Sequence, residues 1–145
     1  MISVEAHFKQ WGLDFIGEIH PSSAQHKWIL TATDYFTKWI EAIPSRTATD
    51  SVIIKFLEAN ILSRFGFPTK IITDNADAFK SKNMVDFYHK YHISLRNSTA
   101  YYPQGNGLDE SSNKILVNII KKLLEENKKS WHGKLVHALD RKSVV

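Results

Sequence analysis

The order of short apolar segments along this chain is what most constrains its fold. Three segments with strand-like alternation fall close together, at residues 11–17, 26–33 and 37–43, and turn residues bound each of them. Pro44 is expected to end the third segment, because proline cannot donate to a ladder of hydrogen bonds. Strands this close in sequence favour an antiparallel meander.

Helical segments then alternate with two more strands. Apolar residues at helical spacing predict a helix that ends at Gly66, and Thr47 with Asp50 resembles the capping box at which such a helix starts. The remaining elements are expected to be a strand over 69–73, a helix over 81–91, a strand over 93–95, a helix over about 107–127, and a short helix from about 130. The order βββ-α-β-α-β-α predicts an α/β fold with a central five-stranded mixed sheet flanked by helices.

Length and composition narrow the class of protein. The 145 residues correspond to a single domain, 1–145. The absence of cysteine excludes a disulfide scaffold, a cysteine nucleophile and a cysteine-ligated zinc site. Since no segment suits a membrane span and the start lacks a signal-peptide pattern, we expect a soluble intracellular protein without a membrane partner.

The net charge of +4 is divided unevenly along the chain. Residues 1–79 carry 7 basic and 9 acidic side chains, whereas residues 80–145 carry 12 basic and 6 acidic ones. A basic half is expected where one face of a protein meets nucleic acid, although a solvated lysine-rich helix gives the same asymmetry.

Three carboxylates stand out by their context. Asp14 interrupts an apolar strand, Asp74 ends another, and Glu110 lies in the first turn of the long helix. Each has an ordinary explanation: a hydrogen-bonded structural aspartate, turn chemistry, and an acid that complements the helix dipole. Together they could converge on hard divalent cations, which take oxygen ligands, and two such ions about 4 Å apart suit phosphoryl transfer.

Four segments in a fixed order carry a resemblance. They are 11–17 (WGLDFIG), 34–39 (DYFTKW), 71–75 (IITDN) and 101–114 (YYPQGNGLDESSNK), and 35 residues separate Asp74 from Glu110. In this order and spacing they resemble the catalytic core of retroviral and gypsy-type LTR-retrotransposon integrases, over roughly residues 8–135.

The resemblance implies a ribonuclease-H-like fold in which Asp14, Asp74 and Glu110 form the catalytic triad and bind two Mg²⁺ or Mn²⁺ ions. It implies DNA 3′-end processing and strand transfer, by which a retroelement is integrated into target DNA in the nucleus. It also implies a homodimer or higher oligomer. The candidate DNA-binding residues are Asn75, Gln104, Asn106, Asn113, Lys114 and Lys121.

The chain departs from the family pattern in three places. Ala76 stands where the family commonly has glycine, so a positive φ there would strain the turn that aims Asp74. Asp109 adds negative charge beside Glu110, and the match decays after about residue 132, as in a truncated or diverged C-terminus. These departures leave open a catalytically inactive remnant that binds nucleic acid or oligomerises. A ribonuclease-H-type nuclease is a third reading, against which the 35-residue interval argues.

Overall fold

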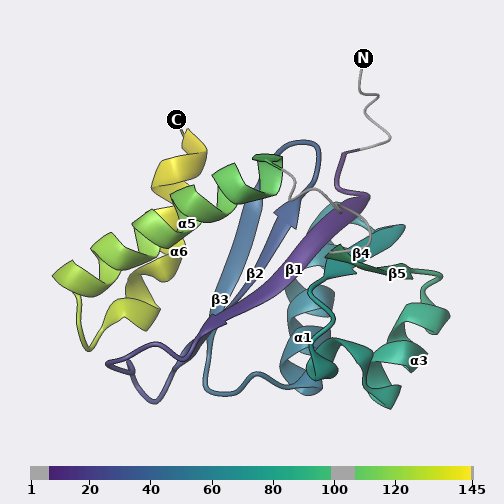
Figure 1. The fold of residues 1–145 in the computed structure, drawn as a ribbon, viewed down its shortest axis with the longest axis horizontal. Helices are drawn as coiled ribbons and strands as arrows, with labels where there is room; N and C mark the ends of the chain where they lie inside the picture. Colours follow the sequence, from purple (N-terminus) through teal and green to yellow (C-terminus); the bar gives the residue numbers. More distant parts are fainter. Residues whose placement is uncertain (1–6, 99–106, 145) are drawn as a thin grey trace.

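The computed structural model describes residues 7–98 and 107–144, except for the side chains of 107–114, 136 and 140–144 (Figure 1). The strands are β1 (Gln10–Gly17), β2 (Trp28–Asp34), β3 (Ile40–Ser45), β4 (Lys70–Thr73) and β5 (Ser94–Asn97). The helices are α1 (Asp50–Phe56), η2 (Leu57–Leu62), α2 (Ser63–Phe65), η3 (Asp77–Lys80), α3 (Lys82–Lys90), α5 (Gly107–Glu126) and α6 (Trp131–Val144). Segments α1, η2 and α2 follow one another without a break, and η2 has π-helical geometry.

The five strands form one mixed sheet in the order β3-β2-β1-β4-β5. β1, β2 and β3 pair antiparallel as a meander, while β4 pairs parallel to β1 and β5 parallel to β4. Helices α5 and α6 lie on one side of this sheet, and α1 and α3 lie on the other (Figure 1). The predicted element order and the five-stranded mixed sheet are therefore confirmed.

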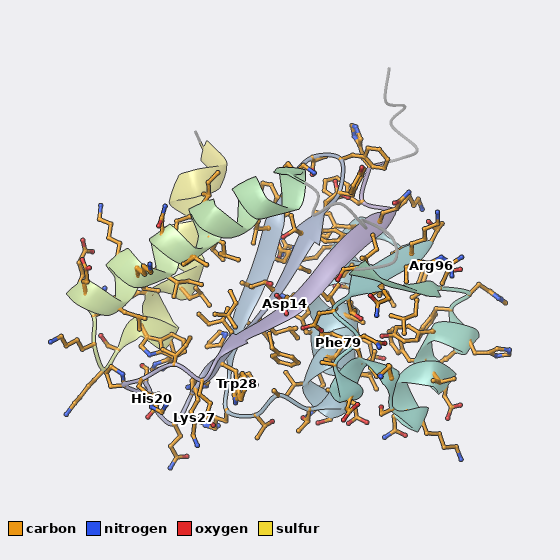
Figure 2. All side chains as sticks on the ribbon, viewed as in Figure 1. Asp14, His20, Lys27, Trp28, Phe79 and Arg96 are labelled. Carbon is orange, nitrogen blue, oxygen red and sulfur yellow. The ribbon has the colours of Figure 1, made fainter. Side chains whose placement is uncertain are left out.

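β1 is the central strand of the sheet, and its side chains contribute to both faces. Trp11 and Leu13 are buried on the side of α1 and α3, whereas Ile16 packs against the core under α5 and α6. Asp14 lies midway along β1, and it shares the face of Ile16 because side chains alternate along a strand (Figure 2).

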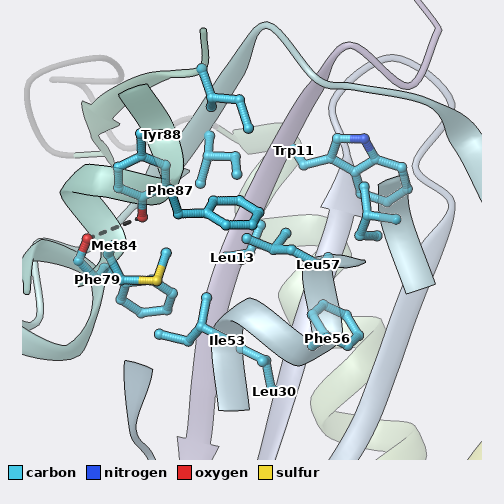
Figure 3. Close-up of a cluster of buried hydrophobic side chains, with 14 residues drawn as sticks. Trp11, Leu13, Leu30, Ile53, Phe56, Leu57, Phe79, Met84, Phe87 and Tyr88 are labelled. Carbon is cyan, nitrogen blue, oxygen red and sulfur yellow. Dashed lines mark hydrogen bonds between the residues drawn. The ribbon is translucent and has the colours of Figure 1, made fainter. Parts of the chain in front are cut away.

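Two hydrophobic cores result from this alternation. In the first core, Trp11 and Leu13 pack with side chains of the segment that begins at α1 and with Met84 and Phe87 of α3 (Figure 3). In the second core, buried residues of β2 and β3 meet the two C-terminal helices. The members from those helices are Leu116, Ile120, Leu123, Trp131, Leu135 and Leu139. The segment 131–139 thus contributes to a core.

Three local expectations differ from the structure. β3 continues through Pro44 to Ser45, because β3 is an edge strand and its outer side needs no donor from proline. α1 begins at Asp50 after Thr49, which makes no side-chain cap, so the capping box at Thr47 is wrong. Ile115, expected in the core stripe of α5, is 46% exposed, because the 3–4 spacing of its buried neighbours places it beside the stripe.

The buried carboxylate of Glu41 joins β3 to the end of the helical segment that begins at α1. Trp39 Nε1 donates to Glu41 Oε2 at 2.6 Å, and Arg64 Nη1 lies 2.5 Å from Glu41 Oε1. Glu41 is 8% exposed, so loss of this partner should cost more stability than loss of the partner of an exposed carboxylate.

Replacing Arg64 with alanine is therefore expected to lower the free energy of unfolding by about 1–2 kcal/mol, since half of the arginine side chain remains in solvent. Urea unfolding followed by far-UV circular dichroism measures this loss. Lys55→Ala, which removes an exposed lysine from α1, is the matched control and should change stability by less than about 0.5 kcal/mol. Equal losses in both variants would contradict the role given to this ion pair.

No helix among the described residues combines the length and apolar character that a membrane crossing requires.

Candidate functional site

Parallel pairing of β1 with β4 brings Asp14 and Asp74 level with each other. Gly12 is the register partner of Ile72, and each aspartate lies two residues further along its strand direction. Asp74 follows directly after the last residue of β4, Thr73. The two carboxylates thus come from neighbouring strands of the sheet.

The environment of Asp14 disfavours its negative charge. The side chain is partly buried on the face of the sheet that α5 covers. Burial raises the pKa of Asp14 from 3.8 to about 6, and the nearby negative charge of Asp74 contributes to this rise, against a hydrogen bond from the backbone of Phe15. An anionic Asp14 therefore gains from any cation placed between the two carboxylates.

Asp74 is exposed and is held by the turn that follows it. The backbone N–H of Ala76 donates to Oδ1 of Asp74 at 3.1 Å, and the backbone N–H of Asn75 donates to Oγ1 of Thr73 at 3.3 Å. Asn75 has a φ of 71°, whereas Ala76 has a φ of −62° and a ψ of 149°. The strain expected at Ala76 is absent, because the positive φ belongs to Asn75 and Ala76 adopts an ordinary extended conformation.

The third expected ligand, Glu110, lies in the first turn of α5, the helix that covers the Asp14 face of the sheet. Its side chain is outside the described part of the structure, as are those of Asn113, Lys114 and Asp109. Two further DNA-contact candidates, Gln104 and Asn106, lie outside the described residues altogether. Lys121 is described and is exposed to solvent on α5.

The two described carboxylates suit a hard divalent cation. Within 7–98 and the described part of α5 and α6, neither Asp14 nor Asp74 forms an ion pair. Two oxygen donors that repel each other are the kind of ligands that Mg²⁺ and Mn²⁺ take. Among the described residues no three carboxylate, histidine or cysteine side chains group together.

Thr73 also contributes to the site, although it is not among the candidate residues predicted from the sequence. Its side chain is 2% exposed, and its hydroxyl accepts the N–H of Asn75 in the turn that presents Asp74. The signal was present in the run Thr-Asp-Asn, since threonine and aspartate both accept backbone N–H groups two residues on.

Comparisons with known proteins indicate the family of this chain. The integrase core domain family matches residues 5–103. The Gag-Pol polyprotein of avian reticuloendotheliosis virus is 35% identical over 133 residues, which cover 92% of this chain and 12% of the relative. The Gag-Pol polyprotein of baboon endogenous virus (strain M7) is 35% identical over 132 residues, or 90% of this chain and 8% of the relative.

The Pol polyprotein of feline endogenous virus ECE1 is likewise 35% identical over 132 residues, covering 90% of this chain and 12% of the relative. The chain thus spans only 8–12% of the length of these three relatives. The mixed five-stranded sheet with flanking helices is the ribonuclease-H-like fold of integrase cores. With this sheet, this element order and these relatives, the chain belongs to the integrase core domain family, of the retroviral type.

Proposed function

We propose that this chain is the catalytic part of an integrase that processes DNA 3′ ends and joins them to target DNA in a reaction dependent on Mg²⁺ or Mn²⁺. The metal ligands are Asp14, Asp74 and Glu110, which together hold two ions. The observation that carries the proposal is the level placement of Asp14 and Asp74 on neighbouring parallel strands. Membership of the integrase core domain family supports it.

The chain's own residues would orient the reaction rather than form covalent bonds. Asp14 is fixed by the central strand β1, and Asp74 by the N–H of Ala76, so both carboxylates are pre-positioned. When bound, the cations supply charge neutralisation at the phosphodiester and activation of the attacking oxygen. That oxygen belongs to water during end processing and to the DNA 3′-hydroxyl during strand transfer.

DNA is the proposed partner, both as element ends and as target. The basic second half of the chain supports this, since lysine contacts with phosphates give affinity that decreases as salt increases. Lys121 is exposed on α5 and available for such a contact, and Lys114 and Asn113 precede it on the same helix. Gln104 and Asn106 remain proposed contacts. We further propose that the protein forms a homodimer or higher oligomer and that it acts in the nucleus.

An inactive remnant of the family is the alternative function. Three departures from the family pattern favour this alternative, and the structure weakens two of them. Ala76 adopts an extended conformation that any residue tolerates. Trp131, Leu135 and Leu139 are buried, so the divergence after about residue 132 has not removed the packing of this segment. The remaining departure that favours the inactive remnant is Asp109 beside Glu110.

The replacement Asp74→Asn tests the proposal. It removes one anionic ligand, so the heat of Mn²⁺ binding in isothermal titration calorimetry should be lost together with the joining of oligonucleotide ends to target DNA. Asp77→Asn is the matched control, because Asp77 is an exposed aspartate three residues on that faces Lys80 at 3.9 Å. The control should retain Mn²⁺ binding and joining.

Joining by Asp74→Asn at the wild-type rate would remove Asp74 from the proposed triad. DNA binding by the wild-type protein without any heat of Mn²⁺ binding would instead favour the inactive remnant.

A further inference from the structure

The turn after β4 presents Asp74 through a specific backbone path. Thr73 is the last residue of β4 and is buried, whereas Asp74, Asn75 and Ala76 are exposed. The N–H of Ala76 donates to Oδ1 of Asp74 at 3.1 Å. This bond fixes the direction of one carboxylate oxygen relative to the sheet, so the position of the Ala76 peptide determines where Asp74 offers its oxygens.

One residue gives the turn its shape. Asn75 lies in the left-handed region with a φ of 71°, and the chain returns to extended geometry at Ala76. The reversal at Asn75 directs the following N–H back toward the side chain of Asp74. Asparagine enters this region several times more often than other non-glycine residues, whereas a β-branched residue there is an outlier.

We propose that Asn75 is a positioning residue for Asp74, acting through its left-handed backbone conformation. The proposal rests on the function proposed above, in which Asp74 binds the catalytic cation. It gives Asn75 a role different from the DNA contact expected from the resemblance. The side chain of Asn75 matters here only because it permits the backbone conformation.

Two replacements separate the backbone role from a side-chain role. Asn75→Gly removes the side chain but keeps access to positive φ, since glycine populates this region freely. Asn75→Val also removes the amide but excludes positive φ, because its branched Cβ clashes there. A backbone role predicts that the two variants differ, whereas a DNA contact through the amide predicts that they behave alike.

The first measurement needs neither metal nor DNA. Amide hydrogen exchange at Ala76, followed by NMR and corrected for sequence, reports the bond from its N–H to Asp74. Wild type and Asn75→Gly should exchange at rates within about threefold of each other, and Asn75→Val should exchange about tenfold faster. Far-UV circular dichroism and tryptophan fluorescence confirm that each variant is folded.

The second measurement is Mn²⁺ affinity by calorimetry. Asn75→Gly should stay within about twofold of wild type and Asn75→Val should bind about tenfold more weakly, while metal-free DNA affinity by fluorescence anisotropy stays unchanged in both. Equal losses of DNA affinity in both variants with unchanged Mn²⁺ affinity would overturn the proposal. Unaltered exchange at Ala76 in Asn75→Val would overturn it as well.

Failure of the proposed function is distinguishable from failure of this inference. If the wild-type protein binds no Mn²⁺, the metal-dependent function falls, and the exchange at Ala76 still decides whether Asn75 sets the position of Asp74.

Discussion

Asp14→Asn is expected to stabilise the metal-free protein at neutral pH and, at the same time, to abolish metal-dependent strand transfer. Burial and the charge of Asp74 raise the pKa of Asp14 to about 6 in the folded chain, against 3.8 for the ordinary carboxyl group. The folded state therefore binds a proton at Asp14 more tightly than the unfolded state does. Wild-type protein loses stability as this proton leaves.

The pH window follows from the two pKa values. Below about pH 3.8 the carboxyl group is protonated in both states and carries no penalty. Between about pH 4 and 6 the penalty grows, and above pH 6 it reaches at most about 3 kcal/mol, at 1.36 kcal/mol for each unit of pKa. The asparagine side chain has no ionisable group, so the variant should exceed wild-type stability by up to that amount at pH 7.5 and by about 1 kcal/mol at pH 4.5.

Urea unfolding of the metal-free protein at both pH values measures the difference. Asp77→Asn serves as the control, because it makes the same change of side chain at an exposed position outside the two hydrophobic cores. With Mg²⁺ and DNA present, Asp14→Asn should lose at least about 100-fold in the rate of strand transfer, since a carboxylate ligand is gone. A stability difference that does not change with pH would contradict the electrostatic origin of the gain.

Trp131→Ala is expected to lower the free energy of unfolding by about 3–5 kcal/mol. Trp131 is the first residue of α6, has 0% exposure, and donates from Nε1 to the carbonyl of Pro21 at 3.0 Å. Its removal leaves a cavity in the second core and leaves that carbonyl without this donor. The same core supports α5, on which Glu110 lies, so strand transfer should weaken along with stability.

Trp131→Phe separates packing from hydrogen bonding. It retains most of the buried ring and loses the N–H, so its loss should be smaller, about 1–2 kcal/mol. Guanidinium unfolding followed by circular dichroism measures both variants without reliance on tryptophan emission. A loss below about 1 kcal/mol in Trp131→Ala would show that α6 does not unfold cooperatively with the sheet.

The sequence predicted those parts of the fold that local patterns determine. The alternation of Trp11 and Leu13 against Asp14 identified β1 and its faces, and both aspartates of the expected site were recognised by their strands. Their level placement depends on the parallel pairing of β1 with β4, in which Gln10 pairs with Lys70 and Gly12 with Ile72. No local pattern specifies a contact between residues so far apart in the chain. Family resemblance supplied that information in place of periodicity.

Other features depend on context that composition does not reveal. Ile115 and Leu116 are equally apolar, and Leu116 is buried because its side of α5 faces the sheet, whereas Ile115 lies beside the buried stripe. At the turn that follows β4, in contrast, the sequence does contain the relevant information. The family pattern has glycine where this chain has Ala76, but the asparagine at position 75 is itself the better indication of a positive φ.

Pro44 has a consequence for how copies of this chain can associate. A bare sheet edge offers a row of unpaired N–H and carbonyl groups to which a strand of another molecule can bind, which is a common start of aggregation. Pro44 lies within β3, at one margin of the sheet, and deprives that row of a donor. At the other margin β5 is only four residues long. Continuous strand addition is thus disfavoured at both margins of the sheet.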